Sequence, residues 1–133
     1  NAENPFTRYL SAALAQHNQD SDKAIALLNE TLKLQADYTP ALLSLYGISK
    51  GLKQDVAPVI LRIKETQKAF PQNQALHALL LNVYQQERRN ADIIAFLEPQ
   101  LKAAENLGPN AYGILAGAYA AERQARREAF KSK

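Results

Sequence analysis

The sequence predicts an all-α chain built from helix–turn–helix units that recur about every 34 residues. The first observation behind this prediction is that apolar residues recur in columns with spacings of 35 and then 34 residues. The second is that the apolar residues of each unit follow a helical stripe, and that the sequence has neither a sustained strand-like alternation nor a hairpin turn. The columns are Ala24, Val59 and Ile93; Leu28, Ile63 and Leu97; and Leu34, Ala69 and Ala103.

The first unit contains a helix over residues 22–34, in which the apolar positions form one stripe. Ser21 or Asp20 is expected to cap this helix, because both side chains accept hydrogen bonds from the first free N–H groups. The second unit opens at Thr39 and Pro40. A capping residue followed by proline is typical of a helix start, where the missing N–H of proline costs nothing.

The next helix is expected to start at Asp55, with Pro58 inside its first turn, and to end before Pro71. Asn90 is expected to cap the helix that follows it, which begins at Ala91. Two more columns run through these units at the same period, one of Tyr46, Leu80 and Leu115 and one of Tyr84 and Tyr119.

Residues 108–110, Gly-Pro-Asn, are expected to separate the sixth helix from a seventh helix over residues 112–121. Pro99 lies well inside the sixth helix and is expected to bend its axis, because proline removes one backbone hydrogen bond. In total the sequence predicts eight helices, the last of them truncated. Phe130, in that last helix, is expected to pack back on the seventh.

Several positions match the first-helix pattern of a known repeat. The best match is the segment from Ala111 to Tyr119, and weaker matches occur in the first two units. The chain resembles the tetratricopeptide repeat (TPR) family, in a degenerate form. The matching residues are Tyr112, Leu115, Ala116 and Tyr119; Tyr46, Gly47 and Pro71; and Ala24, Leu28 and Leu32. The departures are Leu81, Val59, Ile93, Lys50, Ala36 and Glu105.

The resemblance implies a right-handed α-α superhelix, or solenoid, of about three and a half repeats. The repeats would cover residues 5–38, 39–73, 74–108 and, in part, 109–133, after an N-terminal extension or expression scar at residues 1–4. Because the sequence contains no Met, we expect it to be a piece of a longer protein.

Composition excludes several classes of function. There is no Cys, which excludes disulfides, thiolate metal sites and Cys nucleophiles. The two histidines, His17 and His77, lie 60 residues apart in the sequence, and no Ser has a paired base. We therefore expect neither an enzyme nor a cofactor or metal. The longest nearly uncharged apolar stretch, residues 111–121, is too short for membrane insertion.

Charge is concentrated at one end of the sequence. The formal net charge is +3, but residues 122–133 hold five basic and two acidic residues, which leaves 11 of each sign in residues 1–121. The basic end is expected to be the solvated face of a terminal helix, and no nucleic-acid partner is expected. Self-association through this end is a further expectation, because an uncovered solenoid end tends to bury itself.

Two glycine pairs occur within the predicted helices, Gly47 with Gly51 and Gly113 with Gly117. Each glycine costs about 1 kcal/mol of helix stability relative to Ala. Two explanations remain open: the glycines permit close helix approach, or they leave room on a concave surface.

In the resembling family the first helix of each repeat lines a concave groove that binds a peptide. When the family's groove positions are carried over residue by residue to this sequence, the resulting groove is polar and weakly charged. That character argues against a clamp for a C-terminal carboxylate. Asn82 is the favoured contact, because an amide both donates to and accepts from a peptide backbone; the alternative is a solvated helix residue. The candidates are Arg8, Ala12, Gln16, Ser44, Ile48, Gly51, Ala78, Asn82, Gln85, Gly113 and Gly117.

Three functional hypotheses follow. The leading one is a protein-interaction scaffold. The second is an accessory domain of a larger enzyme or envelope machine, since residues 96–101 and the segment after them look like repeats that accompany bacterial zinc metalloproteases or exopolysaccharide and pilus assembly proteins. This likeness favours a soluble protein on the periplasmic side of a bacterial envelope over the cytoplasm. The third is an RNA-binding helical repeat, which requires a basic inner face.

Overall fold

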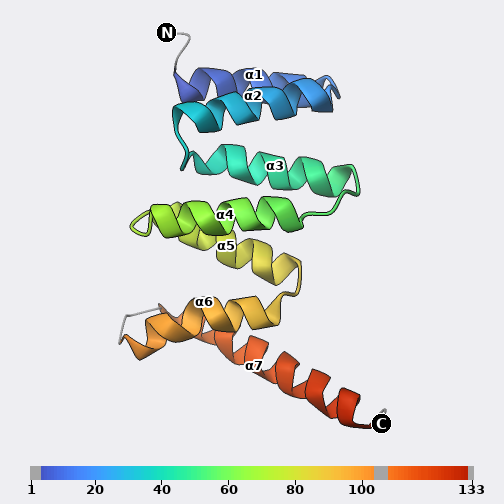
Figure 1. Ribbon diagram of the computed structural model, residues 1–133, viewed down its shortest axis with the longest axis vertical. Helices are drawn as coiled ribbons and strands as arrows, with labels where there is room; N and C mark the ends of the chain where they lie inside the picture. Colours follow the sequence, from blue (N-terminus) through green and yellow to red (C-terminus); the bar gives the residue numbers. More distant parts are fainter. Residues whose placement is uncertain (1–3, 104–107, 132–133) are drawn as a thin grey trace. The chain divides into compact units, whose positions relative to one another are not determined.

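The computed structural model describes residues 4–103 and 108–131, a part of the chain in which α-helices are joined by turns and short loops (Figure 1). Helices account for 83% of it and no strand is present in it, which confirms the all-α prediction. The described helices are α1 (Pro5–His17), α2 (Ser21–Leu34), α3 (Thr39–Gly51), α4 (Ala57–Ala69), α5 (Gln74–Gln86), α6 (Asn90–Lys102) and α7 (Gly108–Lys131).

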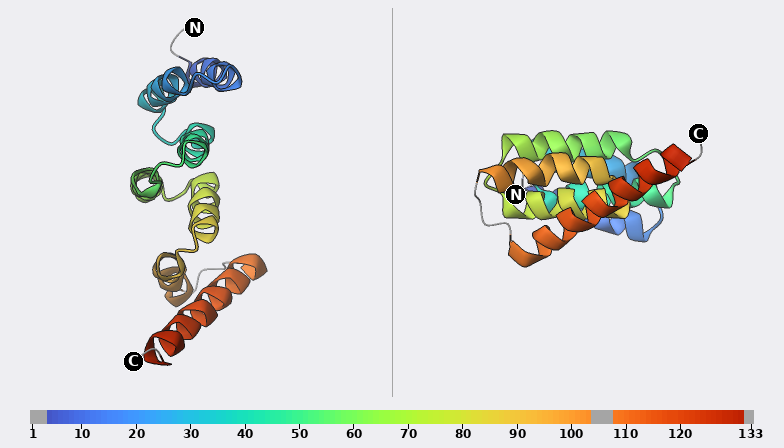
Figure 2. Two further views of the ribbon diagram at one scale, coloured as in Figure 1. Left: turned by 90° about the vertical axis from the view of Figure 1, so that its right-hand side faces the viewer. Right: turned by 90° about the horizontal axis from the view of Figure 1, so that it is seen from below.

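The chain forms two compact units, one ending at Leu80 and the other beginning at Leu81, so that the division falls inside α5. In the first unit consecutive helices pack on one another: α1 on α2, α2 on α3 and α3 on α4. Figure 2 shows α1 lying along α2. The centre of this unit consists of fully buried aliphatic side chains, among them Leu28, Leu42, Ile63 and Leu76.

In the second unit α6 packs against α7. Leu97 from α6 and Leu115 from α7 are buried, as are Val83 and Tyr84 from the C-terminal half of α5. Burial of apolar surface at about 25 cal/mol per Å² is the main stabilising contribution to such a small helical unit.

The turns between helices repeat with the period found in the sequence. Gln19, Lys53 and Arg88 have φ values of 61°, 57° and 55°. Each donates its N–H to the carbonyl three residues earlier, and the next residue donates to the carbonyl five residues before itself. This is the Schellman arrangement that ends a helix, with its left-handed residue at spacings of 34 and 35.

The predicted buried columns are largely confirmed. Leu28, Ile63 and Leu97 have no exposed surface, and Tyr46, Leu80 and Leu115 are also buried. Ala24 and Ile93 are buried and Val59 is half-buried. The prediction is wrong for the column of Leu34, Ala69 and Ala103. All three residues are exposed, because they lie at or just beyond the C-terminal ends of their helices. Tyr84 is buried, whereas Tyr119 is 38% exposed.

Helix caps agree with the sequence at some positions and not at others. Asp20 caps α2 by accepting a hydrogen bond from Lys23 N–H at 3.2 Å. Thr39 is not a cap but the first residue of α3, because its hydroxyl turns back to donate to the Asp37 carbonyl. Asn90 likewise lies inside α6 as its first residue.

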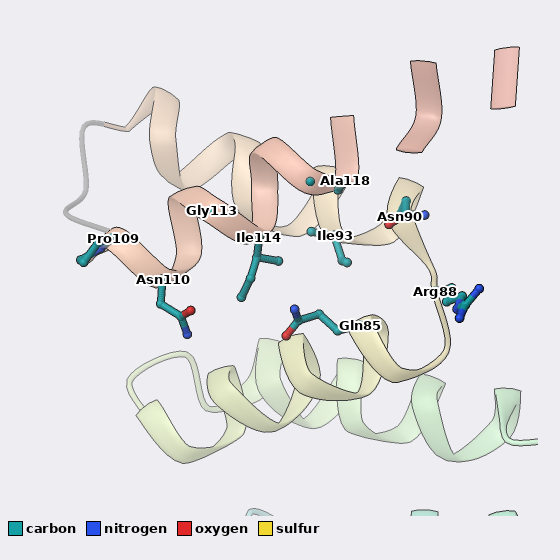
Figure 3. A pocket seen from close by; sticks show the side chains of 10 residues that line it. Gln85, Arg88, Asn90, Ile93, Pro109, Asn110, Gly113, Ile114 and Ala118 are labelled. Atoms are coloured by element: carbon teal, nitrogen blue, oxygen red, sulfur yellow. The ribbon is translucent and has the colours of Figure 1, made fainter. Parts of the chain in front are cut away.

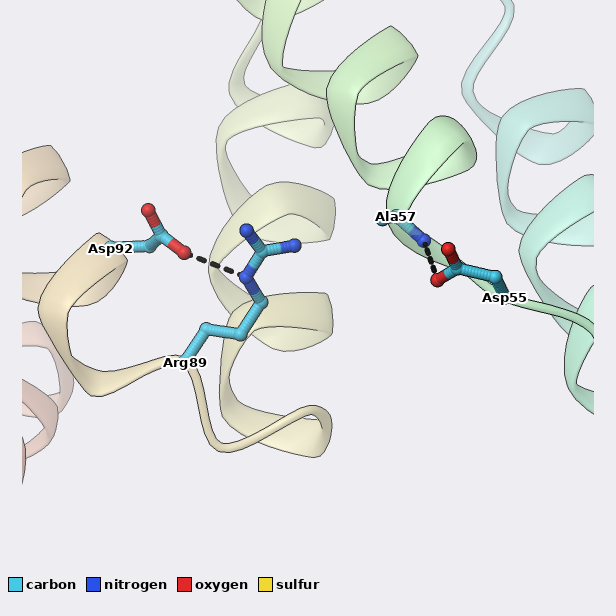
Figure 4. Close-up of polar contacts among 4 residues, drawn as sticks. All are labelled: Asp55, Ala57, Arg89 and Asp92. Carbon is cyan, nitrogen blue, oxygen red and sulfur yellow. Dashed lines mark hydrogen bonds and ion pairs between the residues drawn. The ribbon is translucent and has the colours of Figure 1, made fainter.

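Asp55 precedes its helix by two residues and accepts a hydrogen bond from Ala57 N–H at 3.0 Å (Figure 4). Pro58 lies in the first turn of α4, which ends at Ala69, ahead of Pro71. Pro99 lies inside α6, as expected. The bend expected at Pro99 stays a prediction.

The prediction of separate seventh and eighth helices is wrong. α7 is a single helix of 24 residues that continues through residue 122 to Lys131 (Figure 2). The segment after Ala121 contains no Gly or Pro and is rich in Ala, Glu, Gln and Arg, which are strong helix formers. Phe130 does not pack back on α7: it belongs to the same helix and is 83% exposed. Residues 1–3 of the expected extension, Glu105 and Lys133 lie outside the described residues.

Candidate functional site

A hollow of about 410 Å³ opens in the second unit between the end of α5, the start of α6 and the first half of α7 (Figure 3). We call it the α5–α7 hollow. It is lined by Gln85, Arg88, Asn90, Ile93, Pro109, Asn110, Gly113, Ile114, Gly117 and Ala118.

One side of the hollow is a single face of α7. Gly113, Ile114 and Gly117 lie three, four and seven residues after Asn110, which places all four on the same side of the helix. In Figure 3 the side chains of Asn110 and Ile114 point from α7 towards Gln85, which points back from α5. The hollow therefore has an amide on each of two opposing helices.

The two glycines of α7 have no packing function within the described residues. A Cβ atom added at Gly113 or Gly117 would meet no atom within 4 Å, and the same holds for Gly47 and Gly51. Close helix approach, the first of the two explanations open from the sequence, does not fit this geometry. The glycines instead leave the backbone of α7 uncovered along the hollow.

The lining is polar and weakly charged. Gln85, Asn90 and Asn110 contribute side-chain amides, each able to donate and to accept hydrogen bonds. Ile114 contributes apolar surface, Ile93 is buried, and Arg88 is the one charged residue among the described lining residues. Among these same residues the lining has no carboxylate, hydroxyl or imidazole.

The turn that carries Gln85, Arg88 and Asn90 is fixed by neighbouring side chains. Arg89 Nε donates to Asp92 Oδ2 at 2.6 Å (Figure 4). The Arg89 guanidinium lies 6.0 Å from the centroid of the Tyr84 ring, and that ring meets Phe96 edge-on at 6.2 Å. Burial raises the pKa of Tyr84, the Asp92 carboxylate raises it further and Arg89 lowers it.

The opposite end of the α6–α7 contact is held by a hydrogen bond from the Tyr119 hydroxyl to the Glu98 carboxylate. This bond lowers the pKa of Glu98 and raises that of Tyr119. Lys102 adds a 3.6 Å ion pair to Glu98, which also favours the ionised carboxylate. The Tyr119–Glu98 hydrogen bond joins α7 to α6, whereas the Lys102–Glu98 ion pair lies within α6.

Of the residues implied by the family resemblance, the structure brings Gln85, Gly113 and Gly117 together in the α5–α7 hollow. Asn82, the favoured contact, is exposed on α5 but does not line the hollow. Its Oδ1 accepts a hydrogen bond from Gln86 Nε2 at 2.5 Å, so the side chain is engaged within its own helix.

The candidates in the first unit are more scattered. Gln16, Gly51 and Ala78 are exposed, and Arg8 and Ser44 are partly exposed. The expectation is wrong for Ala12, which has no exposed surface, and for Ile48, which is 7% exposed. Both belong to the buried core of the unit, so neither can contact a partner.

Sequence reasoning missed Arg88, Asn90, Asn110 and Ile114 as members of the site. For the α7 residues a signal was present: a helix that begins at Gly108 places Asn110 and Ile114 on the face of Gly113 and Gly117. The prediction treated residues 108–110 as a spacer and so removed Asn110 from that face.

Comparison with protein-family models, with curated proteins and with solved structures gives no match to this chain. Within residues 4–103 and 108–131, no cluster of three or more His, Asp or Glu side chains could hold a metal ion. Among these same residues, none of the helices combines the length and the apolar character needed to cross a membrane.

Proposed function

We propose that this chain is a non-enzymatic protein-interaction module of the TPR type, and that it binds an extended peptide in the α5–α7 hollow. The observation that carries the proposal is the pair of glycines in α7 whose missing side chains leave an open strip of backbone along a polar hollow. The proposal includes a solenoid arrangement of the helix pairs, which the periodic Schellman turns support.

Gly113 and Gly117 destabilise the helix in which they lie. Each lowers helix stability by about 1 kcal/mol relative to Ala. A Cβ atom added at Gly113 or Gly117 would meet no atom within 4 Å. Close packing within the unit therefore does not offset the loss of helix stability. A ligand whose backbone runs against α7 would use the space, because glycine permits the closest approach of two backbones.

The remaining lining fits a peptide backbone. Gln85 and Asn110 oppose each other across the hollow, so their amides can pair with the N–H and C=O groups of an extended segment. Ile114, which is partly exposed, would contact an apolar side chain of the peptide. With Arg88 as the one charged group among the described lining residues, the hollow is suited to an internal segment rather than to a C-terminal carboxylate.

The test is selection of a random peptide library displayed on phage against the full chain, followed by affinity measurement of the selected peptides. Gly113→Leu fills the open strip and is expected to weaken binding strongly. Gly47→Leu is the matched control, because it places the same side chain on α3 at a glycine that is equally open. Circular dichroism checks that both variants remain helical.

Asn110→Leu provides a second variant, since it removes one amide and leaves the glycines intact. Peptides that bind the original chain and the Gly47→Leu variant alike, but lose affinity for Gly113→Leu and Asn110→Leu, would support the proposal. It would be wrong if the selection yielded no binders, or binders indifferent to both substitutions in the hollow.

A further inference from the structure

The C-terminal turns of α7 present a surface that no described part of the chain covers. Every residue from Arg123 to Lys131 is exposed, and Phe130 exposes 83% of its surface. The last buried residue of α7 is Ala118. α6 has 13 residues against 24 in α7, so the C-terminal part of α7 has no helix packed on it within the second unit.

Five residues of this segment form one face around a hollow of about 560 Å³: Arg123, Arg126, Arg127, Phe130 and Lys131. Offsets of three, four, seven and eight residues place them on the same side of the helix. We call this the basic face of α7. The methylene stems of the arginines and the Phe130 ring supply the apolar part of this lining, which we call the apolar floor. The cationic groups lie at the ends of those stems.

The basic face concentrates positive charge on one side of α7. Arg123 and Arg127 are four residues apart, and so are Arg127 and Lys131, so these cations are neighbours on the helix surface. The Glu128 carboxylate accepts a hydrogen bond from the Gln124 amide at 3.0 Å. A ligand that supplies negative charge would therefore meet complementary charge on this face.

We propose that the basic face of α7 binds an acidic amphipathic helix of another protein. Arginine guanidinium groups pair with carboxylates in two-pronged geometry, and three of them surround the apolar floor. An apolar side chain of the partner helix would contact Phe130, and Asp or Glu residues one turn to either side would meet the cations. The two helices would pair face to face, with charge complementarity between the cations of α7 and the carboxylates of the partner.

Other occupants fit less well. Two copies of the face in antiparallel contact would place arginine against arginine, which opposes self-association here. A membrane surface requires more apolar area than one Phe side chain provides. A nucleic-acid footprint is expected to extend over more phosphates than this face reaches, yet residues 1–121 carry equal numbers of basic and acidic groups.

The test uses the full chain and a labelled synthetic helix with Leu at its a and d positions and Glu beside them, measured by fluorescence anisotropy. We expect the triple variant Arg123→Gln, Arg126→Gln, Arg127→Gln to weaken binding by about tenfold or more. The control variant Lys23→Gln, Lys33→Gln, Lys68→Gln removes the same charge from exposed sites in the first unit and should bind normally.

Phe130→Ala removes the apolar contact and leaves the net charge unchanged. It is expected to weaken binding of the acidic helix. A peptide in which Gln replaces every Glu should bind weakly to every variant. The proposal is overturned if the triple variant and its control bind the acidic helix equally. It is also overturned if the chain prefers phosphatidylserine vesicles or poly(U) RNA to the acidic helix, or if light scattering shows a dimer that Phe130→Ala dissociates.

Discussion

Ile63 is the middle member of the column that begins at Leu28 and ends at Leu97, and its side chain has no exposed surface. Truncation of Ile63 to Ala removes buried methyl groups and leaves a cavity, so it should lower the free energy of unfolding by about 2–5 kcal/mol. Lys68, exposed on the same helix, should tolerate the change to Ala within about 0.5 kcal/mol. Urea denaturation of the two variants measures both values. Equal losses would contradict the assignment of Ile63 to the core.

Tyr119 and Glu98 make a second residue-level prediction, because their hydrogen bond is sensitive to pH. The bond lowers the pKa of Glu98 from its ordinary 4.5, so its stabilising effect is present above that pH and is lost as the pH falls through the lowered value. The same bond raises the pKa of Tyr119 from 10.0, so the effect is present below pH 10.0 and is lost as the pH rises through the raised value.

The change that tests this bond is Tyr119→Phe. The melting temperature of the variant should lie below that of the original chain near neutral pH. The difference should shrink at acidic pH below 4.5 and again at alkaline pH above 10.0. Leu43→Ala, which removes an exposed side chain from the first unit, serves as a control with no such pH dependence. A difference that is constant with pH would show that the hydroxyl does not stabilise through Glu98.

At the scale of single elements, the helix-to-helix turns and α7 follow different rules. The turns at Gln19, Lys53 and Arg88 adopt left-handed backbone without glycine, although glycine is the residue that favours this conformation. α7, by contrast, carries Gly113 and Gly117 in regular helix, where glycine is unfavourable. These turns therefore form their left-handed residue without glycine, whereas the glycines of α7 lie in regular helix with open space beside them.

The α7 glycines give an element-level prediction. Gly117→Ala should raise the free energy of unfolding by up to about 1 kcal/mol, because alanine favours the helix and its Cβ meets no other atom. Thermal and urea denaturation measure the gain. Ala118→Gly, at the adjacent buried position, is the control and should destabilise the chain. A loss of stability in Gly117→Ala would mean that the glycine is closely packed after all.

At the scale of the whole molecule, the C-terminal end of the chain differs from the rest in its net charge. Residues 1–121 contain equal numbers of basic and acidic residues, and the excess positive charge lies in residues 122–133. Electrostatic binding to polyanions depends on the number of phosphates neutralised and falls steeply with salt. Such binding should therefore be weak and confined to the C-terminal segment.

Deletion of residues 123–133 tests this distribution. The shortened chain should lose any salt-dependent retention on heparin and any affinity for single-stranded RNA, while its circular dichroism still shows a helical protein. A chain with Lys33→Gln and Lys68→Gln should keep whatever affinity the original has, because these positions lie outside the basic end. Steep salt-dependent RNA binding by residues 1–122 would favour the RNA-binding hypothesis instead.

The sequence alone determined the helical class, the period of about 34 residues and most of the core, because amphipathic periodicity is a local property that burial at Leu28, Ile63 and Leu97 directly reflects. It narrowed the cap of α2 to Ser21 or Asp20, and the structure shows the hydrogen bond at Asp20. It failed at α7, where an assumed repeat boundary replaced the local preference of Ala, Glu, Gln and Arg for continued helix.

Only the tertiary structure decided the candidate site. Gln85 comes from α5 and Asn110 and Ile114 come from α7, and no spacing in the sequence shows that the two helices line one hollow. The structure also excluded Ala12 and Ile48, whose small or apolar side chains are compatible with either a groove or a core. Periodicity shows which residues share a face of a helix, but contact between faces depends on how helices pack, and packing is fixed by the whole set of side chains between them.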